Sequence, residues 1–204
     1  MSSSSKGITR REFLKLAAVI AGGGFAGGAF VRYRNLWQQP LARVLVLKAA
    51  SYEQDLVDLI KRGVQNFPVT LQHVQGSRVV LKPNLVEYYG DRCVNTNPLI
   101  VAAAIEAFRS LGAREVIVAE GPGHQRDMEL LLEASGLEDV LSQEKTSFVD
   151  LNLDSIAAVR LQQNYTQLGE LFLPKTILGA DLVVSMPKLK IHHWAGVTLS
   201  LKNM

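Results

Sequence analysis

Residues 115–119 read Glu-Val-Ile-Val-Ala, and this run decides the fold class. A nearly continuous apolar run of this length is typical of a strand buried on both faces, as in a parallel sheet. A helix is predicted on each side of it. Upstream, Asn97 and Pro98 supply an N-cap and a first helical position, and Gly112 follows the last apolar residue of the stripe. Downstream, a shorter helix is predicted over 127–135.

The same alternation extends along the chain in both directions. Further strands are predicted over 43–48 (RVLVLK), 78–81, 147–151 and 180–186. After the first of these, Ser51 and Gln54 form a capping-box signature ahead of a helix, whose apolar stripe consists of Leu56, Leu59, Ile60 and Val64. Strands that alternate with amphipathic helices predict an α/β domain over 43–204, with a mostly parallel sheet and helices packed on it.

The N-terminal residues carry a targeting pattern rather than a fold signal. Residues 9–15 read Thr-Arg-Arg-Glu-Phe-Leu-Lys and precede an apolar stretch over 16–31. An arginine pair followed by Phe-Leu, a basic residue and a modest apolar segment matches the twin-arginine export signal. The apolar stretch contains 16 residues, five of them glycine, so it falls short of the roughly 20 that a transmembrane helix needs. We therefore expect Arg10 and Arg11 to address the chain to the twin-arginine export machinery.

This interpretation divides the chain into a signal or anchor segment over 1–34, a linker over 35–42 and the α/β domain. The expected location is the periplasm or an equivalent compartment outside the cytoplasm. Small residues at 27–29 would permit cleavage of the signal, whereas Arg32 and Arg34 could equally flank a membrane anchor retained over 16–31.

Charge and cysteine content exclude several classes of function. Six of the 22 basic residues and one of the 19 acidic residues lie in 1–34, so the remaining chain has a formal net charge of −2. The basic pI belongs to the leader, and no nucleic-acid partner is indicated. Cys93 is the only cysteine. This chain alone therefore provides neither an intrachain disulfide nor four cysteine ligands for an iron–sulfur cluster.

Polar residues follow the predicted strands, where ligands bind in open α/β sheets. Lys82 and Asn84 follow the second strand, and Glu120 follows the third. If the strand ending near Met186 continues past Pro187, alternate residues share a face; these are Lys188, Lys190 and His192, with His193 opposite. Two ammonium groups beside an imidazole suit an anionic ligand. The alternative is a solvated basic edge that prevents aggregation of an exposed strand.

The loop Glu120-Gly-Pro-Gly-His124 permits two interpretations. Gly121 and Gly123 allow backbone amides to approach a ligand, so the loop is a candidate anion nest. A metal-binding pair of Glu120 and His124 is a further ligand-binding interpretation of the loop. A simple strand-to-helix turn explains the loop residues equally and is the favoured interpretation. Separately, a divalent metal held by Glu120 with His192 or His193 is a candidate site.

Five ordered motifs together resemble the domain of unknown function 362 family: Leu81-Lys82-Pro83-Asn84-Leu85-Val86, Asn97-Pro98, Gly112-Ala113 before EVIVAEGPG, Met186-Pro187-Lys188-Leu189-Lys190 with His192, and Ser200-Leu201-Lys202-Asn203. The similarity spans about 43–204. It adds Lys202 and Asn203 as candidate ligand-binding residues. The family domain usually continues past the last motif, so the resemblance implies an incomplete domain. Some relatives carry ferredoxin-type segments, which this chain cannot reproduce with one cysteine.

Two functions are compatible with these residues. The first is an exported enzyme, dependent on a metal or cofactor, that acts on a small anionic substrate through Lys82, Lys188, Lys190 and His192. Asn84, Gly121, Gly123, Lys202 and Asn203 would then bind the ligand. The second is a non-catalytic periplasmic ligand-binding or redox-partner module, which the lack of a nucleophile elbow or P-loop favours.

Overall fold

The computed structural model describes residues 11, 43–90, 92–123, 125–163 and 167–204. The predicted leader other than Arg11, the predicted linker over 35–42 and His124 lie outside these residues. The chain separates into two compact units, Met1–Val44 and Leu45–Met204, and the second contains the α/β domain. Among the described residues, no helix is both long and apolar enough to cross a bilayer.

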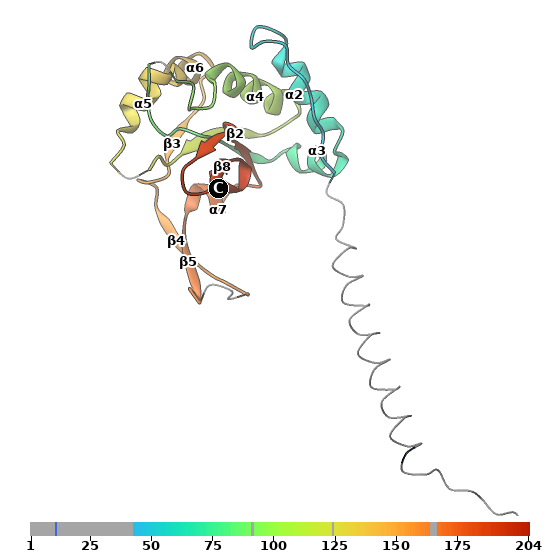
Figure 1. Ribbon diagram of the computed structural model, residues 1–204. Coiled ribbons are helices and arrows are strands. Elements are labelled where there is room, and N and C mark those ends of the chain that lie inside the picture. The colour runs from blue at the N-terminus through green and yellow to red at the C-terminus, as the bar shows by residue number, and fades with distance from the viewer. Residues whose placement is uncertain (1–10, 12–42, 91, 124, 164–166) are drawn as a thin grey trace, which may run out of the picture. The chain divides into compact units, whose positions relative to one another are not determined.

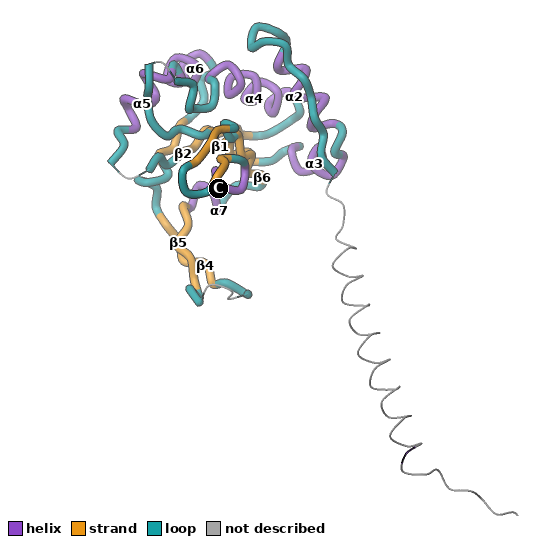
Figure 2. Tube along the Cα trace, in the orientation of Figure 1, coloured by secondary structure: helices purple, strands orange, loops and turns teal. Residues whose placement is uncertain are grey.

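A four-stranded parallel sheet forms the centre of the second unit (Figures 1 and 2). The strand order is β3-β2-β1-β6. Every neighbouring pair is parallel, which confirms the predicted fold class. The strands are β1 (Arg78–Pro83), β2 (Glu115–Glu120), β3 (Phe148–Asp150) and β6 (Leu182–Met186).

Helices cover one face of this sheet (Figure 1). Val79 and Leu81 of β1 and Val116 and Val118 of β2 pack into the main core against those helices. The opposite face carries a smaller cluster that includes Val80. The helices of the main core are α2 (Leu56–Gln65), α3 (Pro68–Val74), α4 (Pro98–Ser110), α5 (Met128–Ser135) and α6 (Leu137–Gln143).

Short elements complete the unit and lie beyond or beside the sheet. Two antiparallel hairpins pair β4 (Ile156–Arg160) with β5 (Glu170–Pro174), and β7 (Lys190–His192) with β8 (Gly196–Thr198). The short helices are α7 (Lys175–Leu178), which packs under the smaller cluster through Ile177, and α8 (Ser200–Asn203). The sequence pattern did not predict these hairpins, nor α3, α6, α7 and α8.

Local signals position the helices around the sheet. Asn97 accepts a hydrogen bond from the backbone N–H of Leu99 at 2.9 Å, and Pro98 begins α4. Asp127 caps α5 in the same way. Gly136 ends α5 in the left-handed conformation, with φ of 73°, which a residue without a Cβ adopts at little energetic expense. These three predicted boundaries are confirmed.

Three predictions of local structure were wrong: one strand, one helix cap and one strand end. Residues 43–48 form no strand, and Val44 and Val46 are 80% and 86% exposed. A β-branched run becomes a strand only where a ladder partner is available, and no described strand pairs with this segment. Ser51 does not cap α2, because Asp55 accepts the N–H of Asp58 at 2.8 Å instead. The second strand runs to Pro83 rather than ending at Leu81, since β6 continues to pair beside it.

Candidate functional site

A cavity of about 470 Å³ opens where β1 and β2 end, beside the β7–β8 hairpin. This volume is within the range of small-molecule sites. It brings together nine predicted site residues: Lys82, Asn84, Glu120, Gly121, Gly123, Lys190, His192, Lys202 and Asn203. Two further polar residues of the lining, Asn152 and Thr198, were not predicted. Asn152 lies two residues after β3, so the strand-end rule that pointed to Lys82 and Asn84 applied to it as well. Thr198 belongs to the β7–β8 hairpin and follows no strand of the main sheet.

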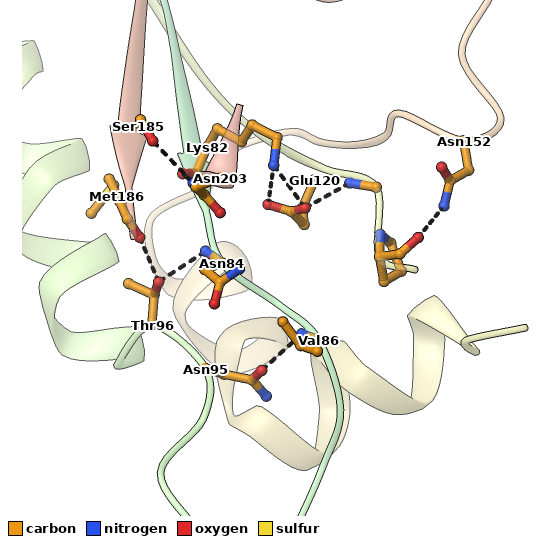
Figure 3. A network of polar contacts seen from close by, with 12 residues as sticks. Lys82, Asn84, Val86, Asn95, Thr96, Glu120, Asn152, Ser185, Met186 and Asn203 are labelled. Atoms are coloured by element: carbon orange, nitrogen blue, oxygen red, sulfur yellow. Dashed lines mark hydrogen bonds and ion pairs between the residues drawn. The ribbon is translucent and has the colours of Figure 1, made fainter. Parts of the chain in front are cut away.

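A buried ion pair forms part of the lining of this site (Figure 3). Lys82 Nζ lies 2.8 Å from both carboxylate oxygens of Glu120. The side chains are only 12% and 4% exposed. They meet because β1 and β2 are neighbouring parallel strands whose carboxyl ends lie at the same edge. The backbone N–H of Gly121 also donates to Glu120 Oε1, at 3.1 Å.

Burial raises the pKa of Glu120 above its ordinary value of 4.5. The ammonium group of Lys82 and the amide of Gly121 act in the opposite direction but do not overcome the desolvation of the carboxylate. The Glu120 carboxyl group therefore binds a proton more readily than an ordinary glutamate side chain.

A second network fixes the chain that leaves β1 (Figure 3). Thr96 Oγ1 accepts the backbone N–H of Asn84 at 2.9 Å and donates to the carbonyl of Met186 at 2.6 Å. The N–H of Thr96 in turn donates to the carbonyl of Asn84. One threonine thereby joins the ends of β1 and β6 and holds Asn84 against the cavity.

Asn203 connects α8 to the same strand ends. Its Nδ2 donates to the carbonyl of Lys82 at 3.0 Å and contacts Ser185 Oγ at 3.1 Å. The Oδ1 of Asn203 has no hydrogen-bond partner, although the residue is only 5% exposed. The same is true of Asn84 Oδ1 and Thr198 Oγ1, which belong to two other residues of the cavity lining.

The β7–β8 hairpin contributes positive charge to the site. Lys190 Nζ donates to the carbonyl of Val94 at 2.7 Å. Burial, followed by the charge of Lys202, lowers the pKa of Lys190. Partial desolvation and Lys202 likewise lower the pKa of His192.

Backbone hydrogen bonds fix the tautomer of His192. Its Nδ1 lies 3.2 Å from the backbone N of Trp194 and 3.1 Å from that of Ala195, and accepts both N–H groups. The proton of the neutral imidazole is consequently assigned to Nε2. His192 is thus a hydrogen-bond donor to a ligand through Nε2.

The prediction that Lys188 shares a strand face with Lys190 and His192 was wrong. β6 ends at Met186 and β7 begins at Lys190, so Pro187, which has no N–H to donate, interrupts the ladder. Lys188 lies outside the cavity lining. Although burial acts against it, the neighbouring Cys93 and Tyr52 raise the pKa of Lys188.

His193 also lies outside the cavity lining and is exposed. Its ring stacks on His192 with a centroid distance of 4.9 Å and an interplanar angle of 9°. It therefore contacts the site only through His192.

The two loop glycines have different surroundings. A Cβ added to Gly121 would lie 2.9 Å from Asn152 Oδ1 and 3.2 Å from the Cβ of Leu151. A Cβ on Gly123 would meet nothing within 4 Å. Because the Gly121 amide bonds Glu120, it is unavailable for the anion nest considered above. Gly121 is instead required for the close approach of the loop to Asn152, whose Nδ2 donates to Pro122 at 2.9 Å.

Comparison with known proteins places the chain in a family. The family described as Domain of unknown function (DUF362) matches residues 79–204, which is more than half of the chain. The chain belongs to the DUF362 family. All residues of the cavity lining fall within the DUF362 region, whereas 43–78 precede it.

One relative is the thylakoid-associated protein sll1697 of Synechocystis sp. (strain ATCC 27184 / PCC 6803 / Kazusa). It is 29% identical over 133 residues, which cover 63% of this chain and 38% of the relative. The chain thus spans little more than a third of the length of that protein. No solved structure matches the chain.

The DUF362 site offers poor ligands for a metal. In the described ranges, no three His, Cys, Asp or Glu side chains gather as a metal-binding group. Both oxygens of Glu120 contact Lys82. A ligating histidine usually donates its other ring N–H to an acceptor, but Nδ1 of His192 accepts two hydrogen bonds. These residues suit an anion better than a cation.

Proposed function

We propose that the protein binds a small anion in this cavity and acts on it as an exported enzyme. The observation that carries the proposal is the convergence of Lys82, Lys190 and Lys202 on one cavity, whose described lining includes one acidic side chain, Glu120. Because Glu120 is already paired with Lys82, the positive charges of Lys190 and Lys202 are available to a phosphate or carboxylate.

The pKa values support a catalytic role. Lys190 loses its proton more readily than an ordinary lysine because it is partly buried and lies near Lys202. Such a lysine binds the anion as an ammonium group and is a candidate general base in those molecules in which it has lost its proton. Glu120 holds its proton more tightly than an ordinary carboxyl group, so it is a candidate acid. His192 would orient the substrate through Nε2.

The alternative is a ligand-binding module without turnover. It is favoured by one contact: Lys190 Nζ donates to the Val94 carbonyl at 2.7 Å, so the candidate base is already engaged. Lys190→Met separates the two functions. A fall in turnover at saturating substrate, beyond the loss of affinity, indicates an enzyme, and loss of affinity alone indicates a module.

Titration calorimetry with inorganic phosphate and acetate tests the anion site directly. We expect Lys190→Met and Lys202→Met each to weaken binding by about tenfold to a hundredfold, the worth of one charge-assisted hydrogen bond. Lys188→Met is the matched control, because Lys188 lies outside the lining. Equal affinity in all three variants would refute the proposed site.

Export by the twin-arginine route is part of the same proposal. The relative is named thylakoid-associated. This name supports the proposal that the present chain is held at a membrane, through residues 16–31. Replacing Arg10 and Arg11 together by Lys should block export, whereas replacing Lys15 by Arg should not. The measurement is the distribution of the protein between cell fractions. Unimpaired export of the paired variant would contradict the targeting interpretation.

A further inference from the structure

Three buried oxygens without partners gather in the lining of one cavity. They are Asn84 Oδ1, Thr198 Oγ1 and Asn203 Oδ1. Their residues are 8%, 2% and 5% exposed. In the described part of the chain, only one further buried side-chain N or O atom has no hydrogen bond, Arg78 Nε, and it forms an ion pair with Glu115. Among the described residues, the buried side-chain atoms without hydrogen bonds are thus concentrated at the candidate site.

The orientation of Asn203 makes its free atom an obligate acceptor. Its Nδ2 donates to the carbonyl of Lys82 at 3.0 Å (Figure 3). Reversing the amide would point an oxygen at that carbonyl oxygen and leave both without a donor. Oδ1 therefore stays free to accept. Thr198 Oγ1 can accept as well as donate, and Asn84 Oδ1 accepts in the arrangement shown.

Acceptors and lysines select different parts of a ligand. An ammonium group binds phosphate or carboxylate oxygens, but a carbonyl oxygen repels them and needs an O–H or N–H donor. Buried polar groups are normally hydrogen-bonded, so an unpartnered set in a cavity calls for a donor supplied from outside the protein. A bare anion would satisfy Lys190 and Lys202 and accept from the Thr198 hydroxyl, but it would leave Asn84 Oδ1 and Asn203 Oδ1 unpaired.

We infer that the ligand is a small phosphate or carboxylate that also carries hydroxyl or N–H groups, which donate to Asn84, Thr198 and Asn203. This inference rests on the proposed anion site and specifies its substrate class. Hydroxylated anions and their deoxy counterparts have similar size and the same charge, so discrimination between them depends on the three oxygens. A site that bonds a substrate hydroxyl rejects the analogue lacking it much more strongly than an apolar pocket rejects a change in size.

Calorimetry with two matched probe pairs tests the inference. Glycerol phosphate is compared with n-propyl phosphate, and glycerate with propionate, each at up to about 10 mM. Sulfate serves as the bare anion, because inorganic phosphate carries an O–H group at neutral pH. We expect the hydroxylated member of at least one pair to bind about tenfold or more tightly than its deoxy partner, the effect of one or more hydrogen bonds.

Three variants assign the preference to the cavity. Thr198→Val keeps the shape of the side chain but removes its hydroxyl, so it should reduce the preference. Thr198→Ser retains a hydroxyl and should keep it. Thr70→Val makes the same chemical change in α3, outside the lining, and should have no effect. Thermal unfolding of each variant confirms that it is folded before binding is compared.

The outcomes distinguish this inference from the function on which it rests. If sulfate binds and the members of both pairs bind equally, the anion site stands and the inference is overturned. If no probe binds, the proposed function fails as well. If the preference is present and Thr198→Val leaves it unchanged, the hydroxyl is recognised elsewhere and the inference is again overturned.

Discussion

Removing Lys82 should destabilise the protein strongly and in a pH-dependent way. Lys82→Met would leave the Glu120 carboxylate, 4% exposed, with the Gly121 amide as its remaining hydrogen bond from the network shown. Breaking a buried pair by deleting one partner lowers the free energy of unfolding by about 3–5 kcal/mol. At about 1.4 kcal/mol per tenfold, the folding equilibrium shifts by a hundredfold to several thousandfold.

The sign of the pH dependence follows from the raised pKa of Glu120. Its folded-state pKa already exceeds 4.5 because of burial, and loss of Lys82 raises it further. Between 4.5 and that value the folded protein binds more protons than the unfolded chain, so stability falls as pH rises. The deficit of Lys82→Met should therefore be larger at pH 7 than at pH 5.

Urea denaturation at both pH values measures this effect. Adding Glu120→Gln to Lys82→Met removes the unpaired charge and should recover part of the lost stability at pH 7. Lys202→Met is the control, because it removes an exposed lysine from the same cavity. A deficit below about 1 kcal/mol at pH 7, as for a surface pair, or equal deficits at pH 5 and pH 7, would refute the reasoning.

Three further perturbations test the surrounding structure. Thr96→Val should lower the free energy of unfolding by about 1–3 kcal/mol, since it leaves the N–H of Asn84 and the carbonyl of Met186 without their bonds to Thr96. Thr96→Ser keeps the hydroxyl and should keep the stability. Equal urea midpoints for Thr96→Val and the unchanged protein would contradict the network. Gly121→Ala should destabilise by about 1–3 kcal/mol because its Cβ would crowd Asn152 at 2.9 Å, whereas Gly123→Ala should be neutral in the same assay. The lowered pKa of His192 means that the unfolded chain binds more protons just below pH 6.5, so stability should rise with pH there. His192→Gln should remove that slope in pH-dependent melts, and an unchanged slope would assign it to another group.

The sheet was predictable because its signals are local. Residues 115–119 and 78–81 are apolar runs that form buried strands, and Asn97, Asp127 and Gly136 mark helix ends with their own side chains or backbone. The prediction of a strand over 43–48 was wrong for a non-local reason. A β-branched run satisfies its backbone only if another strand is beside it, and pairing depends on residues far away in the sequence.

The site was predictable to the extent that topology determines it. Strand ends of a parallel sheet meet at one edge, so Lys82 and Glu120 were expected together and lie 2.8 Å apart. Thr198 could not be found in this way, because a hairpin rather than the end of a main strand brings it to the cavity. Asn152 lies two residues after β3, so the same rule would have found it. Lys188 was misplaced because Pro187 ends the ladder, which the assumption of a continuous strand ignored.

The hydrogen bond from Asn203 Nδ2 to the carbonyl of Lys82 joins residues 121 positions apart in the sequence. This separation affects the order in which the site can assemble during translation. A chain emerging from the ribosome can form its N-terminal contacts first, so β1, β2 and the Lys82–Glu120 pair can assemble while β6, the β7–β8 hairpin and α8 are still untranslated. The capacity to hold a ligand then arises in one late step, when residues 182–203 dock. A ligand present in the cytoplasm would act as a folding aid at that moment, since it binds only the assembled form and draws the equilibrium towards it. On the twin-arginine route that we propose for this chain, the filled cavity would mark a chain that has completed its folding before export.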